Sequence, residues 1–265
     1  MGKSNRKKNL KVSVLITNYN NEKYILECIN SVKQQSYKNI EILVNDDNSA
    51  DNSIEILKKL NNVKLIENKT VTKFYSVNHL LALKNLVKKS TGEIIFFLDG
   101  DDYFHLKKIE KIVNFFESND DCKIVFDYPI YVYGNKYVFE KKKFKVFKSY
   151  WPYIHPTSCI SIRKNVVNDL FNSISFGDYN NTWMDFRTCI YSNYILKNFI
   201  ILEDNLTYYR QTNTHYSSSY KKYTISWWRK RLEAHKFFFD FARRNNIKIK
   251  KNLDVLVTKL INVFL

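Results

Sequence analysis

Hydrophobic residues in the first hundred positions follow two spacings in turn. Short apolar runs rich in β-branched and aromatic residues are typical of strands buried on both faces. Between them, apolar residues recur every three to four positions, which predicts helices. Strands and helices that alternate at short intervals predict an α/β fold with a mostly parallel sheet and right-handed crossovers. The predicted strands are 12–17, 40–44, 63–66 and 94–98, and the predicted helices are 24–35, one from about 53, and 76–89.

The second half of the chain is less regular. Its apolar runs predict further short strands, an antiparallel pair within 136–147, and helices over 106–119 and 178–194. From Ile225 onward the pattern is helical. The further strands are 123–132, 159–162, 199–202 and 206–210, and the last helix has an apolar stripe of Leu253, Leu256, Val257, Leu260, Ile261 and Phe264.

Polar clusters follow three of the predicted strands, at 17–20, 46–51 and 99–102. The carboxyl ends of parallel strands share one edge of a sheet, where open α/β sheets bind ligands. Carboxylates gathered there repel one another unless a cation or hydrogen-bond donors offset their charge. The alternative reading of 99–102 is a solvated turn that caps the next helix. Convergence of three clusters favours a ligand site, with Mg²⁺ or Mn²⁺ and a diphosphate as candidates.

Composition narrows the class of protein. The 265 residues suit one large α/β domain, with or without a small appendage, and the net charge of +17 favours anionic partners. Four cysteines without zinc-site or Cys-x-x-Cys spacing indicate a reduced, cytosolic protein. No apolar run reaches the length of a membrane span, and no nucleic-acid-binding motif or Gly-x-Gly-x-x-Gly motif is present.

Three ordered motifs resemble those of the family 2 glycosyltransferases, nucleotide-sugar-dependent enzymes with the GT-A fold. They are VSVLITNYN at 12–20, EILVNDDNSAD at 41–51 and LDGDD at 98–102. The resemblance is good up to about residue 102, looser to about 219 and weak beyond. It implies a GT-A catalytic domain over 1–219, with a nucleotide-binding half at 11–102 and an acceptor half at 103–219. A basic, aromatic helical tail would follow at 220–265.

The resemblance also implies roles for residues in the first half. Thr17 and Asn20 would line the nucleotide pocket, with Glu22 nearby. Asp46 looks like the family's base-contacting aspartate. A carboxylate there can accept a hydrogen bond from a pyrimidine ring N–H, which suits uracil and a UDP-linked donor. Asp99 looks like the first aspartate of the Asp-x-Asp motif, near ribose and metal.

In the same way, Asp101 looks like the metal-binding second aspartate, and Mn²⁺ or Mg²⁺ would bridge it to the donor diphosphate. His215 is a candidate metal ligand, because some members of the family have a histidine there; the alternative is a solvated loop histidine. The cation would stabilise charge on the leaving nucleotide.

The catalytic base of the family is a carboxylate well downstream of the metal motif, often at a helix start with an arginine after it. Asp185, followed by Arg187, is the best match, and Asp178 is the reserve choice. The alternative for Asp185 is a surface ion pair with Arg187. Arg187 and His155, which precedes a Pro-Thr-Ser segment, are predicted on the acceptor side. His79 is read as an ordinary core or surface residue of a helix.

The predicted function is metal-dependent, inverting transfer of a single sugar to a glycan or lipid-linked acceptor of the bacterial surface. The alternatives are a nucleotidyltransferase and a non-catalytic nucleotide-sugar-binding protein. The tail has three alternatives: packing on the catalytic domain, lying on an anionic membrane at the inner face of the cytoplasmic membrane, or forming a dimer seam.

Overall fold

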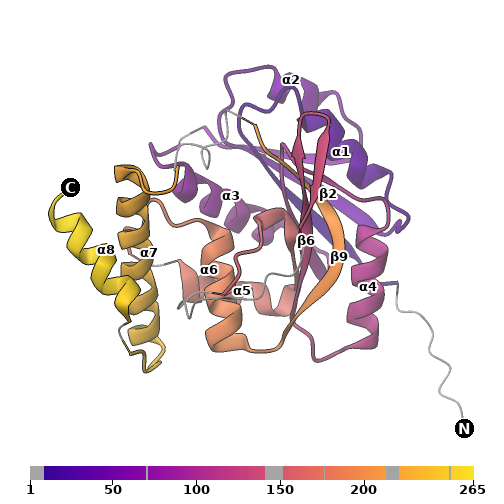
Figure 1. Ribbon diagram of the computed structural model, residues 1–265. Coiled ribbons are helices and arrows are strands. Elements are labelled where there is room, and N and C mark those ends of the chain that lie inside the picture. The colour runs from indigo at the N-terminus through magenta and orange to yellow at the C-terminus, as the bar shows by residue number, and fades with distance from the viewer. Residues whose placement is uncertain (1–8, 70, 141–151, 176, 213–220, 251) are drawn as a thin grey trace, which may run out of the picture.

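Helices cover both faces of one mixed sheet (Figure 1). The computed structural model describes residues 9–265 apart from 70, 141–151, 176, 213–220 and 251. Most of its helices connect successive strands. They are α1 (Ile25–Lys33), α2 (Ser53–Lys58), α3 (Tyr75–Lys89), α4 (Lys108–Ser118), α5 (Lys164–Ile174), α6 (Met184–Tyr191), α7 (Ile225–Arg244) and α8 (Leu253–Val263), with a 3-10 turn at Thr157–Cys159 and a π-helical turn at Ser192–Leu196.

The nine described strands lie in the order β3-β2-β1-β4-β8-β6-β9-β5, and β7 pairs with β6. The first four are parallel, which confirms the predicted α/β class. The strands are β1 (Val12–Asn18), β2 (Ile40–Asp46), β3 (Val63–Glu67), β4 (Ile94–Asp99), β5 (Tyr103–Phe104), β6 (Ile124–Tyr133), β7 (Lys136–Phe139), β8 (Ile160–Arg163) and β9 (Phe199–Arg210).

The register of the parallel half brings the predicted polar clusters together. Thr17 on β1 is paired with Asp99 on β4, and Asn18 is paired with Asp46 on β2. β1 lies between β2 and β4, so the three strands end at the same edge. The shared edge follows from the parallel pairing, as the sequence predicted.

Side chains of the central strands alternate between two hydrophobic cores. On β1, Leu15 packs in the core formed with α3, α5, α6 and α7. Its neighbours Val14 and Ile16 pack in the second core, with α1 and α4. Burial on both faces explains why these strands are almost wholly apolar.

The second half differs from its prediction in three places. β8 is antiparallel to both β4 and β6. The strands predicted at 199–202 and 206–210 are one continuous strand, β9, with a shifted register against β6 around Tyr128. Helix α5 was not predicted, although its apolar residues follow a helical spacing. Of the antiparallel pair predicted within 136–147, β7 is present and residues 141–147 lie outside the described part.

Helix α7 packs against the core that it shares with α3, α5 and α6, and α8 lies against α7 (Figure 1). Phe237, Phe238 and Phe241 of α7 are fully buried in the first core. Within the described residues, no helix is both long and apolar enough to span a bilayer.

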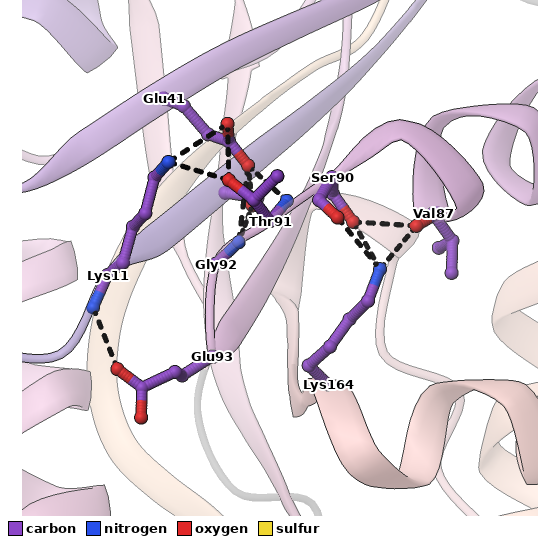
Figure 2. Close-up of polar contacts among 9 residues, drawn as sticks. Lys11, Glu41, Val87, Ser90, Thr91, Gly92, Glu93 and Lys164 are labelled. Atoms are coloured by element: carbon purple, nitrogen blue, oxygen red, sulfur yellow. Dashed lines mark hydrogen bonds and ion pairs between the residues drawn. The ribbon is translucent and has the colours of Figure 1, made fainter.

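The amino-terminal edge of the sheet is closed by a polar cluster (Figure 2). Glu41 accepts hydrogen bonds from the Ser13 hydroxyl at 2.5 Å and from the Thr91 backbone N–H at 2.5 Å. The Ser13 hydroxyl in turn accepts from the Gly92 N–H at 2.8 Å. A Cβ at Gly92 would lie 2.5 Å from the Ser13 nitrogen, so glycine is required there. The cluster holds the link between α3 and β4.

Candidate active site

A cavity of about 1100 Å³ lies at the carboxyl ends of β1, β2 and β4. Its floor comes from the loops that follow these strands, and one wall comes from the start of α3. Residues 181–186, which lie beside α3 through the ring contact of His79 with Trp183, and Lys230 and Ala234 of α7 complete the lining. Segments from both predicted halves and from the predicted tail therefore line one cavity.

Asp99 is held at the centre of this cavity by two side chains. Its Oδ1 accepts a hydrogen bond from the Thr17 hydroxyl at 2.9 Å and lies 2.9 Å from Nε2 of His79. Burial lowers the pKa of His79, but the charges of Asp99, Asp185 and Asp47 outweigh burial, so the pKa is raised. The carboxylates of the cavity therefore favour the protonated form of this imidazole.

The turn after β4 separates the remaining two aspartates. Asp101 lines the cavity, whereas Asp102 points into the protein, where it accepts from the Ser158 hydroxyl at 2.6 Å and from the Arg210 N–H at 2.9 Å. Burial, with the charges of Asp101 and Asp99, raises the pKa of Asp102 well above its ordinary value. Asp102 thus fixes the turn, and Asp99 and Asp101 face the cavity.

Arg210 supports the same turn from β9. Its guanidinium donates to the Asp101 backbone carbonyl at 2.7 Å and to Glu27 at 2.5 Å. It lies over the rings of Tyr24 and Tyr103, at 4.7 and 4.6 Å from their centroids. Through these contacts, Arg210 positions Asp101.

The residues fit a divalent cation that is completed by a ligand, and they do not form a protein cage. Among the described residues, no group of three or more ligating side chains converges on one point. Asp99 and Asp101 supply two carboxylates on one turn, which matches how proteins hold Mg²⁺ or Mn²⁺ together with substrate phosphates. His215 lies outside the described residues.

Asn20 and Glu22 join the two loops beneath the cavity. Asn20, which has a positive φ of 52°, accepts from the Ala50 N–H at 2.8 Å. Glu22 accepts from the backbone and side-chain amides of Asn52, each at 3.0 Å. Both residues also line the cavity, as does Thr17.

Asp46 is placed differently from its prediction. It is fully buried and is not among the residues that line the cavity. Its carboxylate accepts from the Asn18 amide at 2.6 Å, and from the Ser49 hydroxyl and N–H at 2.7 and 2.9 Å. These bonds close the loop after β2 and leave no part of Asp46 for a base.

The next residue, Asp47, lines the cavity instead. Its Oδ1 accepts from the amides of Asn45 and Asn68, at 3.0 and 2.7 Å. Burial raises the pKa of Asp47 to about 6. Tyr19 and Tyr75, with ring centroids 5.5 Å apart, also line the cavity and offer aromatic faces.

Asp185 lies in the first turn of α6 and lines the cavity. Its Oδ1 accepts from the Phe186 N–H at 2.6 Å. Burial raises the pKa of Asp185 and outweighs the opposing effects of that hydrogen bond, of Lys230 and of His79. Asp99 lies near enough to raise it further. Asp185 and the Asp-x-Asp turn therefore share one cavity.

Three other predicted residues lie away from the cavity. Arg187 is buried and donates to the backbone carbonyls of Thr182 and Ile174, at 2.9 and 2.6 Å, so it holds the segment that carries Asp185 and makes no ion pair with it. His155 is a core residue, stacked on Phe126, and burial lowers its pKa to about 4. Asp178 is exposed.

The sequence interpretation missed His79 and Lys230. His79 lies near the start of α3, and its neighbour Asn78 also lines the cavity. A polar residue in the first turns of a helix that begins at the carboxyl edge of the sheet could have indicated this position. Lys230 had no such signal, because it reaches the cavity only through the packing of α7.

Comparison with known proteins agrees with this architecture. The family model described as glycosyl transferase family 2 matches residues 13–184. A Nostoc protein described as an uncharacterized glycosyltransferase is 28% identical over 229 residues, which cover 79% of this chain and 68% of the relative. The Escherichia coli protein WfaP, a UDP-Glc:α-D-GlcNAc-diphosphoundecaprenol β-1,3-glucosyltransferase, is 32% identical over 127 residues, covering 48% of each chain.

Solved structures share the fold. Staphylococcus aureus TarS 1-349 in complex with UDP-GlcNAc superposes with a TM-score of 0.63 and 22% identity, over 89% of this chain and 72% of TarS. The Pyrobaculum calidifontis mannosyltransferase PcManGT, in complex with GDP-Man and Mn²⁺, gives a TM-score of 0.53 and 13% identity, over 94% and 69% of the two chains. These similarities show a GT-A fold.

Proposed function

Because the chain belongs to glycosyl transferase family 2, we propose that it transfers one sugar from a UDP-linked donor to a glycan or lipid-linked acceptor, with inversion and with the aid of Mn²⁺ or Mg²⁺. The observation that supports this proposal most is the convergence of Asp99, Asp101 and Asp185 on one cavity. A non-catalytic nucleotide-sugar-binding protein would have no need of a third carboxylate, Asp185, in the cavity that Asp99 and Asp101 line. A nucleotidyltransferase is disfavoured by the family match.

The donor side follows from the residues at the sheet edge. Tyr19 and Tyr75 offer faces for a base, and Asp47 accepts a hydrogen bond from a ring N–H such as that of uracil. Asp47 replaces Asp46 in this role. WfaP uses a UDP-sugar, and TarS binds UDP-GlcNAc, which supports UDP over other nucleotides.

The reaction needs a base on one side of the sugar and charge stabilisation on the other. Asp185 accepts the proton of the acceptor hydroxyl while the hydroxyl oxygen bonds to the anomeric carbon. At the same time, the bond from that carbon to the diphosphate breaks and UDP is released. A raised pKa suits a carboxylate to this task. A cation held by Asp99 and Asp101 would stabilise the charge that develops on the diphosphate. His79 keeps Asp99 in place.

The acceptor assignment rests on relatives and on sequence. WfaP acts on a sugar linked to diphosphoundecaprenol, which supports a lipid-linked acceptor. The Gln-x-x-Arg-Trp signature of processive synthases is absent from the sequence, which supports a single addition. A role in building a bacterial surface glycan follows from both.

A thermal-shift screen tests the donor and the metal together. UDP-sugars with Mn²⁺ should raise the melting temperature by about 5–10 °C at a hundredfold excess over Kd, and GDP- and dTDP-sugars should raise it less. Asp101→Ala should lose the part of the shift that needs metal. Asp169→Ala, which changes an exposed aspartate of α5, is the control and should keep the whole shift. A UDP shift that is equal with and without metal would contradict the assigned role of Asp101.

A further inference from the structure

Helix α8 presents its apolar side to solvent. The residues it packs against α7 include Val255 and Thr258, which are fully buried, and Asp254, which pairs with Arg231. The apolar stripe seen in the sequence points the other way: Leu260 is 61% exposed and Phe264 is 80% exposed. A single exposed leucine needs no explanation, but a continuous stripe does. The exposed members are Leu253, Leu256, Val257, Leu260, Val263 and Phe264.

The start of α7 continues this surface. The Asn262 amide donates to the Trp228 carbonyl at 3.1 Å, and the Arg229 guanidinium donates to the Leu265 carbonyl at 2.9 Å. The end of α8 therefore lies beside the start of α7, where Tyr223 and Ile225 are also exposed. We call this surface, made of the α8 stripe with Tyr223 and Ile225, the α7–α8 face.

The charge around the α7–α8 face is strongly positive. Residues 221–265 contain twelve lysines and arginines but only Glu233, Asp240 and Asp254 as acids. Each acid has a partner within the chain: Glu233 binds Asn181 and Thr182, Asp240 binds Tyr179 and Arg243, and Asp254 binds Arg231. Basic residues therefore outnumber acidic ones four to one in this segment.

We propose that the α7–α8 face docks on an anionic lipid surface, with its apolar side chains among the lipid headgroups and acyl chains and its lysines and arginines at the phosphates. Charge distinguishes this partner from a second copy of the chain. Two copies, each with a net charge of +17, would repel as they met through this face. Anionic lipid satisfies the apolar stripe and the basic surround together.

The face lies beside a route to the active site. A hollow of about 650 Å³ at the start of α7 is lined by Thr224, Ile225 and Arg229, and it shares Asn181 and Lys230 with the main cavity. A lipid-linked acceptor in the docked bilayer would reach Asp185 along this side. This purpose rests on the proposed function, whereas docking itself does not.

Co-sedimentation of the full chain with vesicles tests the docking. Vesicles with about a third phosphatidylglycerol in phosphatidylcholine should bind the protein, pure phosphatidylcholine should bind it at least tenfold less, and salt above about 0.5 M should release it. The double variant Leu256→Glu/Leu260→Glu should lose at least tenfold in binding to the anionic vesicles. Lys259→Glu, which alters only charge beside the stripe, should lose about threefold.

Leu81→Glu is the matched control, because Leu81 is 47% exposed on helix α3, outside both the α7–α8 face and the cavity lining. It should bind vesicles like the wild type. All variants should keep the thermal shift with UDP-GlcNAc, which shows that they fold and separates this test from that of the donor. Unchanged sedimentation of the double variant would overturn the proposal. So would a concentration-dependent dimer that the double variant abolishes, because the face would then be a subunit interface.

Discussion

The two edges of the parallel sheet carry carboxylates whose pKa burial raises and hydrogen bonds lower, but the balance between the two effects differs. At the amino edge, Glu41 receives donors from Ser13 and Thr91 and lies 3.5 Å from the Lys11 ammonium. Burial raises its pKa, but these partners outweigh burial and lower the pKa to about 2. At the carboxyl edge, burial prevails and raises the pKa of Asp47 to about 6.

The difference shows which carboxylates the chain itself stabilises and which lack enough partners without a ligand. Glu41 is fully engaged by its own chain, so its charge contributes to stability. Asp47 is buried and Asp185 is half-buried, each accepts fewer hydrogen bonds than Glu41, and both line the cavity. Unfavourable local electrostatics at a cavity is typical of a functional site, where the ligand supplies the missing partner.

The largest expected effect comes from removing the proposed base at the carboxyl edge. Asp185→Asn should lower kcat by about 10²–10⁴-fold, because a general base contributes about that much. It should leave the affinity for UDP-GlcNAc and Mn²⁺ within about twofold. Folding stability should be unchanged or slightly higher, since a buried carboxylate with a raised pKa is replaced by a neutral amide. Steady-state transfer kinetics and calorimetric titration give the two numbers.

Asp178→Asn is the matched control, since Asp178 is an exposed aspartate outside the cavity lining. Its kcat should equal that of the wild type. A large loss of kcat in Asp178→Asn, with little loss in Asp185→Asn, would show that Asp178 is the base and would contradict the role proposed for Asp185.

Much of the first half was predictable, because its signals are local. Five apolar residues followed by Asp99 are typical of a strand buried on both faces, and parallel pairing then brings Thr17 and Asp99 to one edge. The second half was harder. The reversed direction of β8 and the continuity of β9 depend on pairing with distant strands, which the local pattern does not encode.

Within the site, the predicted residues Asp99, Asp101 and Asp185 all line the cavity, but the sequence did not indicate which of two adjacent aspartates after β2 faces it. Asp46 and Asp47 differ only in the direction of their side chains at the end of β2, and the loop hydrogen bonds to Ser49 decide it. The apolar stripe of α8 left three alternatives open, and the structure turns the other side of the helix toward α7, where Asp254 pairs with Arg231. In both cases a specific polar contact overrode the general pattern.

A smaller effect is expected at the amino edge. Glu41→Gln should reduce the free energy of unfolding at pH 7 by about 1–2 kcal/mol, a value below the full pKa shift because solvent screens a partly exposed group. The folded-state pKa is lowered from 4.5 to about 2, so the contribution is complete above pH 4.5 and is lost as the pH falls toward about 2. Urea unfolding of both proteins between pH 2 and pH 7 measures this difference.

Activity of Glu41→Gln should stay within about twofold of the wild type, because the amino edge lies away from the cavity. Glu93→Gln is the matched control at the same edge. Glu93 only accepts from the Lys11 N–H at 3.3 Å, so its removal should cost less than about 0.5 kcal/mol. Equal losses in the free energy of unfolding for the two variants would show that Glu41 contributes no more to stability than Glu93.

The smallest effect sharpens the comparison at Asp47. The ionised carboxylate accepts a hydrogen bond from uracil N–H, so donor affinity should fall as Asp47 is protonated. With a pKa of about 6, the Kd for UDP-GlcNAc should rise by about five- to tenfold between pH 7.5 and pH 5. Asp47→Asn should bind UDP-GlcNAc more weakly by a similar factor at pH 7.5, and its Kd should not change over that pH range.

UDP-GlcNAc is the right probe, because it lacks the phosphate monoester that titrates near pH 6 in UDP. Because the charge of Asp47 also raises the pKa of His79, the two pH profiles are compared again in a His79→Gln background to isolate Asp47. Parallel profiles would show that Asp47 does not contact the base, and the raised pKa would then be a consequence of burial alone.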